Sequence, residues 1–128
     1  MMSAWLGLNK RQQGNKGEDL AVKHLKDNGY RILARNVRSK FGEIDSVAQQ
    51  GKILCFIEIK ARTSTSFGWP EESVTREKRW RLVRLARWYL QSKRLEEIPV
   101  RFDVISLLLN PNGSLARARI IPSAFEAA

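Results

Sequence analysis

The stretch Ile53-Leu54-Cys55-Phe56-Ile57-Glu58-Ile59-Lys60 is apolar over its first five residues and then places an acid and a base two residues apart. A short and nearly continuous apolar run is typical of a central strand that is covered on both faces of its sheet. Side chains alternate along a strand, so Glu58 and Lys60 are predicted to share a face with Phe56. The strand is therefore expected to end in a pair of charged groups, which are rarely buried without a partner.

The flanking sequence predicts an α/β domain in which a mixed central sheet is flanked by helices. Apolar residues at strand or helix spacing, separated by turn signals such as Asn110-Pro111-Asn112-Gly113, divide the chain into elements in the order αβββαβ, with an extra last strand. Residues 1–15 are expected to be a flexible basic lead-in to a single domain over residues 16–128. The predicted helices cover residues 16–28 and 75–93, and the predicted strands cover residues 30–37, 42–48, 53–60, 101–109 and 115–121.

Composition indicates a globular chain and excludes several classes of protein. Of the 128 residues, 43% are hydrophobic and 28% are charged, which is typical of one folded domain and not of a disordered chain. The apolar runs are too short to span a bilayer and the N-terminus lacks a signal-peptide pattern, so we expect a cytoplasmic location and no membrane partner. One His and one Cys cannot supply the usual set of about four N or S ligands of a structural zinc site, so any metal must be held mainly by oxygens.

A strong positive charge indicates a polyanionic partner. The chain carries 23 Lys and Arg against 13 Asp and Glu, a net charge of +10, and eight basic residues but only one acid lie between Arg76 and Arg94. This concentration favours nucleic acid as the partner over anionic lipid, an acidic protein or solubility alone. The basic residues predicted to bind nucleic acid are Arg62, Lys78, Arg81, Arg84 and Arg87.

A second acid is predicted to lie beside Glu58. If Gln49-Gln50-Gly51-Lys52 forms a hairpin turn, Asp45 on the preceding strand lies opposite Phe56 and faces the same side as Glu58. Two neighbouring carboxylates repel each other unless a proton or a cation joins them. A divalent cation with oxygen ligands, Mg²⁺ or Mn²⁺, resolves this conflict.

Two further groups complete the predicted metal site. The backbone carbonyl of Ile59 is a candidate ligand, and Lys60 is placed to orient a water at the metal or to help deprotonate it. This is the general plan of metal-assisted phosphodiester cleavage. The alternative is an exposed ion pair between Glu58 and Lys60, because a single acid-x-Lys triplet is a weak signal even though the chain contains no other.

Several short motifs resemble those of a known family. They fall in one order along residues 16–109, which is most of the chain. The motifs are Gly17-Glu18-Asp19-Leu20-Ala21, Gly42-Glu43-Ile44-Asp45, Phe56-Ile57-Glu58-Ile59-Lys60-Ala61-Arg62, Phe67-Gly68-Trp69-Pro70 and Arg101-Phe102-Asp103-Val104. Together they resemble the small bacterial YraN family, which is similar to the restriction-endonuclease-like PD-(D/E)xK nucleases and especially to archaeal Holliday-junction resolvases.

The resemblance implies a restriction-endonuclease-like αβββαβ fold and a metal-dependent endonuclease that hydrolyses DNA, in particular branched or junction DNA. It implies Asp45 and Glu58 as metal ligands, Lys60 as the catalytic lysine and Glu18 as an acid contributed by the first helix. The chain departs from the signature at Ile44, where a Pro is usual, but no metal ligand is lost. A non-catalytic nucleic-acid-binding module and a basic structural protein bound to ribosomal RNA are the alternatives, since a fold does not establish activity.

Other residues allow two interpretations. Glu18 lies in the first turn of its predicted helix, where an acid complements the helix dipole, so it is either a helix-end acid or a site residue. Lys78 falls on the apolar stripe of helix 75–93, and we expect its head to extend to solvent and not to reach the acids. Trp80 and Trp88 are predicted to form a homodimer contact or to be covered by the C-terminal residues, in preference to stacking on unpaired bases.

Overall fold

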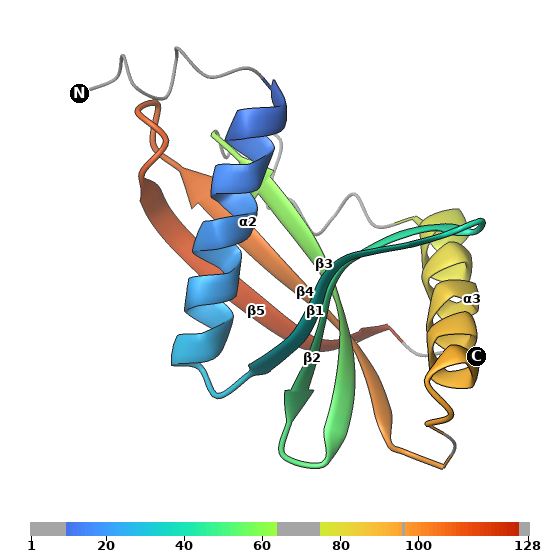
Figure 1. Cartoon of the computed structure of the whole chain (residues 1–128). Coiled ribbons are helices and arrows are strands. Elements are labelled where there is room, and N and C mark those ends of the chain that lie inside the picture. Colours follow the sequence, from blue (N-terminus) through green and yellow to red (C-terminus); the bar gives the residue numbers. More distant parts are fainter. Residues whose placement is uncertain (1–9, 64–74, 96, 126–128) are drawn as a thin grey trace.

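The computed structural model describes residues 10–63, 75–95 and 97–125 of the chain. The predicted α/β class and the element order αβββαβ with an additional last strand are confirmed (Figure 1). The elements are α2 (Lys10–Asp27), β1 (Arg31–Ser39), β2 (Gly42–Gln50), β3 (Ile53–Arg62), α3 (Arg76–Ser92), β4 (Val100–Leu109) and β5 (Leu115–Phe125).

The strands form one mixed sheet in the order β1-β2-β3-β4-β5. Strands β1, β2 and β3 are successive antiparallel neighbours, β3 and β4 are parallel, and β5 returns antiparallel to β4. A parallel pair requires a crossover connection, and α3 lies in the connection between β3 and β4. Strand β3 is therefore the centre of the sheet, as its apolar sequence predicts.

The two helices cover opposite faces of the sheet (Figure 1). Along β3 the side chains alternate between the two layers: Phe56 packs into the cluster with α3, whereas Cys55 and Ile57 pack into the cluster with α2. The apolar stripe of α3 is buried as expected, and Thr75 caps this helix by accepting a hydrogen bond from the backbone N–H of Lys78. No helix in the described ranges is long and apolar enough to cross a membrane.

Helix α2 begins at Lys10, six residues earlier than the predicted helix over residues 16–28. Residues 10–15 are polar and show no apolar periodicity, but the Lys, Arg and Gln among them are good helix formers. Part of the predicted lead-in is therefore helical, while residues 1–9 lie outside the described residues. Glu18 consequently lies well inside α2 and not in its first turn.

The β1–β2 hairpin bends where it passes the end of β3. Asn36 has a left-handed φ of 52°, and the pairs Arg35–Ser46 and Val37–Ile44 bracket Asn36 and Asp45. Beyond the bend, the hairpin reaches across to α3 (Figure 1). At its turn, a Cβ on Gly42 would lie 3.2 Å from the Cδ of Arg81, so only a glycine fits there without a shift of that side chain.

Candidate functional site

The register of β2 against β3 places Asp45 next to Glu58. The ladder runs from the pair Gln50–Ile53 to the pair Ser46–Ile57, so that the turn is the two residues Gly51 and Lys52. The expected pairing of Asp45 with Phe56 is wrong by two residues, because the turn contains two residues and not four, and Val47 is the partner of Phe56. A shift of two residues preserves the face on which each side chain lies, so the expected neighbourhood of the two acids is retained.

Asp45 is tied to the backbone of β3 beyond the end of this ladder. Its Oδ2 accepts a hydrogen bond of 2.8 Å from the backbone N–H of Ile59. The N–H and the C=O of one strand residue point to the same side of the strand. The carbonyl of Ile59 therefore also faces the side on which Asp45 lies, just past the last β2–β3 pair.

The negative charge of Glu58 affects the pKa of Asp45. The pKa of Asp45 is raised to about 7, first because the group is buried and second because of the negative charge of Glu58. The hydrogen bond from Ile59 acts in the opposite direction, and the charge of Glu18 adds to the increase. Asp45 thus belongs to a group of acids contributed by β2, β3 and α2.

Glu58 is 7% exposed and is contacted by two lysines. Its Oε1 lies 2.9 Å from the Nζ of Lys78 and 3.4 Å from the Nζ of Lys60. The expectation that Lys78 extends to solvent is therefore wrong. Lys78 lies one turn before the buried Leu82, and this face of α3 packs toward the sheet, so the shortest route for its side chain ends at Glu58.

The two lysines differ in how readily they lose a proton. Burial lowers the pKa of Lys60, and the neighbouring Lys78 lowers it further, while Glu58 opposes both effects. Burial also acts to lower the pKa of Lys78, but the hydrogen bond to Glu58 outweighs it, and the pKa lies above its ordinary value. Of the two, Lys60 is the better proton acceptor.

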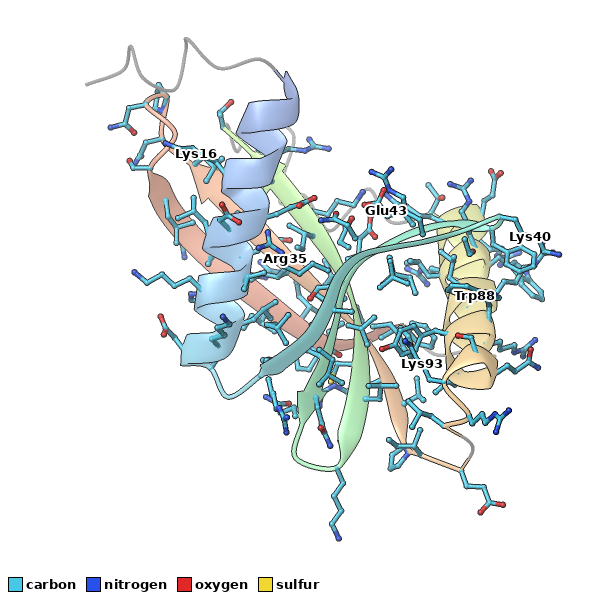
Figure 2. All side chains as sticks on the ribbon, in the orientation of Figure 1. Lys16, Arg35, Lys40, Glu43, Trp88 and Lys93 are labelled. Carbon is cyan, nitrogen blue, oxygen red and sulfur yellow. The ribbon has the colours of Figure 1, made fainter. Side chains whose placement is uncertain are left out.

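Glu18 approaches the site from α2. The first turn of α2 contains no acid, so the explanation of Glu18 as a helix-end acid is wrong. Its Oε2 accepts a hydrogen bond of 3.3 Å from Asn36, the residue at the bend of β1, and lies 3.9 Å from the guanidinium of Arg35. Figure 2 shows Arg35 between α2 and the sheet. Glu18 is thus held on the rim of the acid group by β1.

The donors at this site fit a small divalent cation with oxygen ligands. Within the described ranges, no group of three or more His, Cys, Asp or Glu side chains is arranged to hold a metal, so Glu18 is not counted as a ligand. Asp45, Glu58 and the carbonyl of Ile59 remain as oxygen donors. Mg²⁺ is typically bound by one or two carboxylates, with waters and substrate phosphates as its other ligands, and this donor set matches that requirement.

The predicted nucleic-acid-binding residues are not gathered at one point. Lys78 contacts Glu58 in the acid group, and Arg62 is the last residue of β3, two positions beyond Lys60. Arg81, Arg84 and Arg87 are exposed along α3. Their surface lies next to the turn of the β1–β2 hairpin, where Lys40 is found (Figure 2).

A second charged network, on the α2 side of the sheet, was not predicted. Asp103 is 1% exposed, and its two oxygens accept hydrogen bonds from the side chains of Arg101 and Tyr30 and from the backbone N–H of Ser123. The guanidinium of Arg101 also donates to Gln50 at 2.6 Å. The signal was an acid inside the apolar run of β4. The carboxylate is fully partnered, which indicates a structural role that ties four segments together.

The comparison with known proteins places these residues in one family. A model described as "Uncharacterised protein family UPF0102" matches residues 17–107, a range that contains every predicted site residue. A UPF0102 protein of Symbiobacterium thermophilum is 47% identical over 117 residues, which cover 91% of this chain and 98% of the relative. Relatives of the same description from Moorella thermoacetica and Caldicellulosiruptor saccharolyticus are 46% and 40% identical over 118 residues, with 98% and 100% of their lengths covered.

Proposed function

The chain belongs to the UPF0102 family, in agreement with its resemblance to the YraN family, and from the site that it carries we propose that it is a metal-dependent endonuclease that hydrolyses phosphodiester bonds in DNA. The observation that supports this most strongly is the group formed by Asp45, Glu58 and Lys60 in the second half of the central strand, where its pairing with β2 ends. The resemblance to junction resolvases adds branched DNA as the substrate class.

The roles follow from the positions of the residues. Asp45, Glu58 and the carbonyl of Ile59 hold Mg²⁺ or Mn²⁺, and the hydrogen bond from the Ile59 N–H orients Asp45 for this task. When bound, the metal supplies Lewis-acid stabilisation of the phosphate and lowers the pKa of a water. Glu18 acts through the surrounding charge, because its side-chain contacts are with β1.

Lys60 is placed to accept a proton from the attacking water or to orient that water. In the hydrolysis, the water oxygen forms a bond to phosphorus, the bond from phosphorus to the leaving oxygen breaks, and one proton of the water must be removed. The lowered pKa of Lys60 allows its amine to accept that proton or to orient the water. Lys78 keeps its proton and fixes the second carboxylate, Glu58, from the side of α3.

The charge of the chain supports a nucleic acid as the substrate. Arg81, Arg84 and Arg87 are exposed on α3, the same helix that carries Lys78 to the acid group. A phosphate backbone lying along α3 would bring a phosphodiester toward Glu58. Such contacts release counterions, so the affinity for DNA should fall steeply as salt is added.

One observation favours a second candidate, a DNA-binding module without turnover. Two ammonium groups accompany the two carboxylates, so that Lys60 and Lys78 balance the formal charges of Asp45 and Glu58 without a metal. In that case the site stabilises the fold and only the basic surface is functional. The two candidates predict the same binding and differ in cleavage.

A cleavage assay separates them. The full chain is incubated with linear duplex, nicked, single-stranded and four-way DNA, each with Mg²⁺, with Mn²⁺ or with EDTA. The endonuclease cuts at least one of these substrates with a divalent metal and none in EDTA. Binding without cleavage under all conditions leaves the DNA-binding module as the function.

A further inference from the structure

Two surface hollows lie on either side of one aromatic residue at the turn of the β1–β2 hairpin. Both are lined by Lys40, Phe41 and Arg84. The first hollow, of about 380 Å³, is completed by Arg87, Trp88 and Gln91. The second, of about 350 Å³, is completed by Glu77, Trp80 and Arg81. Each hollow therefore has a tryptophan from α3 as one wall and shares the other wall with its neighbour.

The shared wall is a stack of cations on a phenyl ring. The guanidinium carbon of Arg84 lies 4.8 Å from the centroid of Phe41, and the Nζ of Lys40 lies 5.2 Å from the same centroid. Cation–π contacts hold a guanidinium flat, which leaves its outer face available for stacking. Figure 2 shows Lys40 at the outer end of the hairpin, on the side of α3 that carries Trp88.

The tryptophans expose their rings to different extents. Trp80 is 57% exposed, which is unusual for the largest apolar side chain, whereas Trp88 is half-buried against the core. Eight residues separate the two along α3, which corresponds to about 12 Å along the helix axis. The hollows thus form a short row of flat aromatic surfaces and not a single pocket.

The charge of this row suits a phosphate backbone. Four cations line the hollows, namely Lys40, Arg81, Arg84 and Arg87, and Glu77 is the only acid among the described residues that line them. Arg81 contacts Glu77 at 3.9 Å, while Arg84 and Arg87 have no ion pair within the part of the chain that the structure describes. Alternating cations and aromatic rings are the chemistry that binds single-stranded nucleic acids, since phosphates contact the cations and bases stack on the rings.

The geometry points to this row of hollows as a site for unpaired nucleotides of a DNA substrate, distinct from the acid group. A base stacks on Trp80 and another against Trp88, with the Arg84 guanidinium between them and the phosphates on Lys40 and Arg87. The assignment rests on DNA as the substrate in the proposed function but not on cleavage. The competing assignment for this face is a contact with another protein molecule, such as a second copy of the chain.

The row lies on the same helix as Lys78 but on a different face of it, because Trp80 is rotated by about 200° from Lys78. Lys78, which contacts Glu58, precedes Trp80 by two residues and Trp88 by ten, or about 15 Å along α3. About four stacked nucleotides at roughly 3.4 Å each span that length. A DNA molecule that occupies the row with a short unpaired segment would have to pass around α3 for its paired part to reach Glu58.

The test is a binding measurement in EDTA, where turnover does not interfere. Labelled oligothymidine and a duplex of the same length are titrated with the wild type, Trp80→Ala and Trp80→Phe. Loss of the stacking surface is expected to weaken oligothymidine binding by about tenfold, with Trp80→Phe restoring most of it and duplex binding changing less than about twofold. Oligothymidine should also quench the tryptophan fluorescence of the wild type.

Matched variants control for charge and for loss of apolar surface. Arg84→Lys keeps the charge but not the flat group, so it should lose oligothymidine affinity and keep duplex affinity, whereas Lys52→Gln at the opposite end of β2 should change neither. Leu33→Ala removes another exposed apolar side chain and should bind as the wild type does. The variants are compared at equal folded fraction.

Three outcomes overturn the assignment: equal oligothymidine affinity of Trp80→Ala and wild type, an equal loss for single and double strands, or a wild-type dimer in sedimentation that Trp80→Ala converts to a monomer. The last result assigns the face to a second copy. A protein that binds oligothymidine as described but cuts no DNA refutes only the proposed endonuclease. If the wild type cuts DNA but Trp80→Ala leaves oligothymidine affinity unchanged, only this nucleotide site is refuted.

Discussion

The Nζ of Lys78 on α3 lies 2.9 Å from the Oε1 of Glu58 on β3. This contact joins the crossover helix to the second half of the central strand, at the point where Asp45 on β2 accepts a hydrogen bond from the backbone of Ile59. Glu58 is nearly buried, so its charge needs partners, and α3 supplies the nearer of the two ammonium groups. The position of α3 over the sheet and the electrostatics of the site are therefore coupled.

Removal of the Lys78 charge should destabilise the fold more than removal of a surface charge. Lys78→Met keeps most of the stem but leaves Lys60 as the one ion-pair partner of Glu58 among the described residues, so the free energy of unfolding should fall by about 1–3 kcal/mol. The matched variant Arg81→Met breaks an exposed contact of 3.9 Å with Glu77 and should cost less than about 0.5 kcal/mol. Urea unfolding of both variants measures the difference, and equal losses would show that the Lys78–Glu58 contact contributes nothing.

Stability should depend on pH through Asp45. Its pKa is about 7 in the folded protein and about 3.9 in an unfolded chain, so between these values the folded state holds a proton that the unfolded state has lost. Unfolding free energy therefore decreases as the pH rises from about 4 to about 7 and loses nothing more from this group above that range. Asp45→Asn removes the dependence and should be more stable than the wild type at pH 8, by up to about 4 kcal/mol.

The same comparison at pH 4.5 provides the check on Asp45. There the carboxyl is protonated in the folded wild type and resembles the Asn side chain, so the two proteins should be nearly equal in stability. The measurement is urea unfolding in EDTA, with Asp27→Asn at the exposed end of α2 as the control. An Asp45→Asn advantage of the same size at both pH values contradicts the assignment of the effect to this group.

The buried network around Asp103 should contribute to stability and not to catalysis. The hydroxyl of Tyr30 donates to Asp103 Oδ2 at 2.8 Å, and burial, followed by this hydrogen bond, raises the pKa of Tyr30. Tyr30→Phe should lower the free energy of unfolding by about 1–3 kcal/mol, because a bond to a buried charge is lost. Tyr89→Phe keeps the edge contact with Phe56 at 5.7 Å and should cost less than about 1 kcal/mol. The idea fails if the two tyrosine variants unfold alike.

Charge reversal on α3 should weaken DNA binding of every sequence to the same degree. The double variant Arg84→Glu and Arg87→Glu removes two phosphate contacts, so the slope of log affinity against log salt should become shallower by about 2. Lys23→Glu together with Lys52→Glu makes the same change in net charge at exposed positions away from α3. Binding titrations at several salt concentrations give the affinity and the salt slope of each double variant. If both double variants lose affinity equally, net charge and not the surface of α3 accounts for binding.

The central strand could be predicted in detail because its residues carry the pattern unambiguously. Phe56 and Glu58 lie on the α3 side of the sheet, as strand alternation requires, and Cys55 is buried on the other side. The prediction that Asp45 and Glu58 are neighbours is correct although the predicted turn is two residues too long, because a register shift of two residues leaves each side chain on the same face of the sheet. Alternation is therefore a sounder guide to the site than the length of a turn.

Interactions that depend on packing between elements could not be predicted. The direction in which the Lys78 side chain extends depends on the distance between α3 and β3, and the sequence of the helix does not determine that distance. A register shift between Ile32 and Ala34 sends these residues to opposite layers, although their spacing predicts a common face. Asp103 gave only a weak signal, because its partners Tyr30 and Ser123 lie far away in sequence.

The site residues should separate cleavage from binding. Glu58→Gln and Asp45→Asn should each reduce cleavage by at least about a thousandfold while DNA stays bound, and Lys60→Ala should do so without loss of the metal, since an ammonium cannot be a ligand. Combining Lys60→Ala with Glu58→Gln should change little further, as for residues that act as a unit. Glu18→Gln should have a smaller effect, because Glu18 acts only through its charge on Asp45.

The most direct test of the central claim is a paired measurement of cleavage and metal binding on the wild type and on Glu58→Gln. We expect the wild type to cut DNA with Mg²⁺ or Mn²⁺ and to release heat on titration with Mn²⁺, and we expect Glu58→Gln to bind DNA within about threefold of wild type yet show neither cleavage nor metal binding. The central claim is contradicted by a wild-type protein that binds DNA but gives no heat with Mn²⁺ and cuts neither linear duplex, nicked, single-stranded nor four-way DNA with either metal.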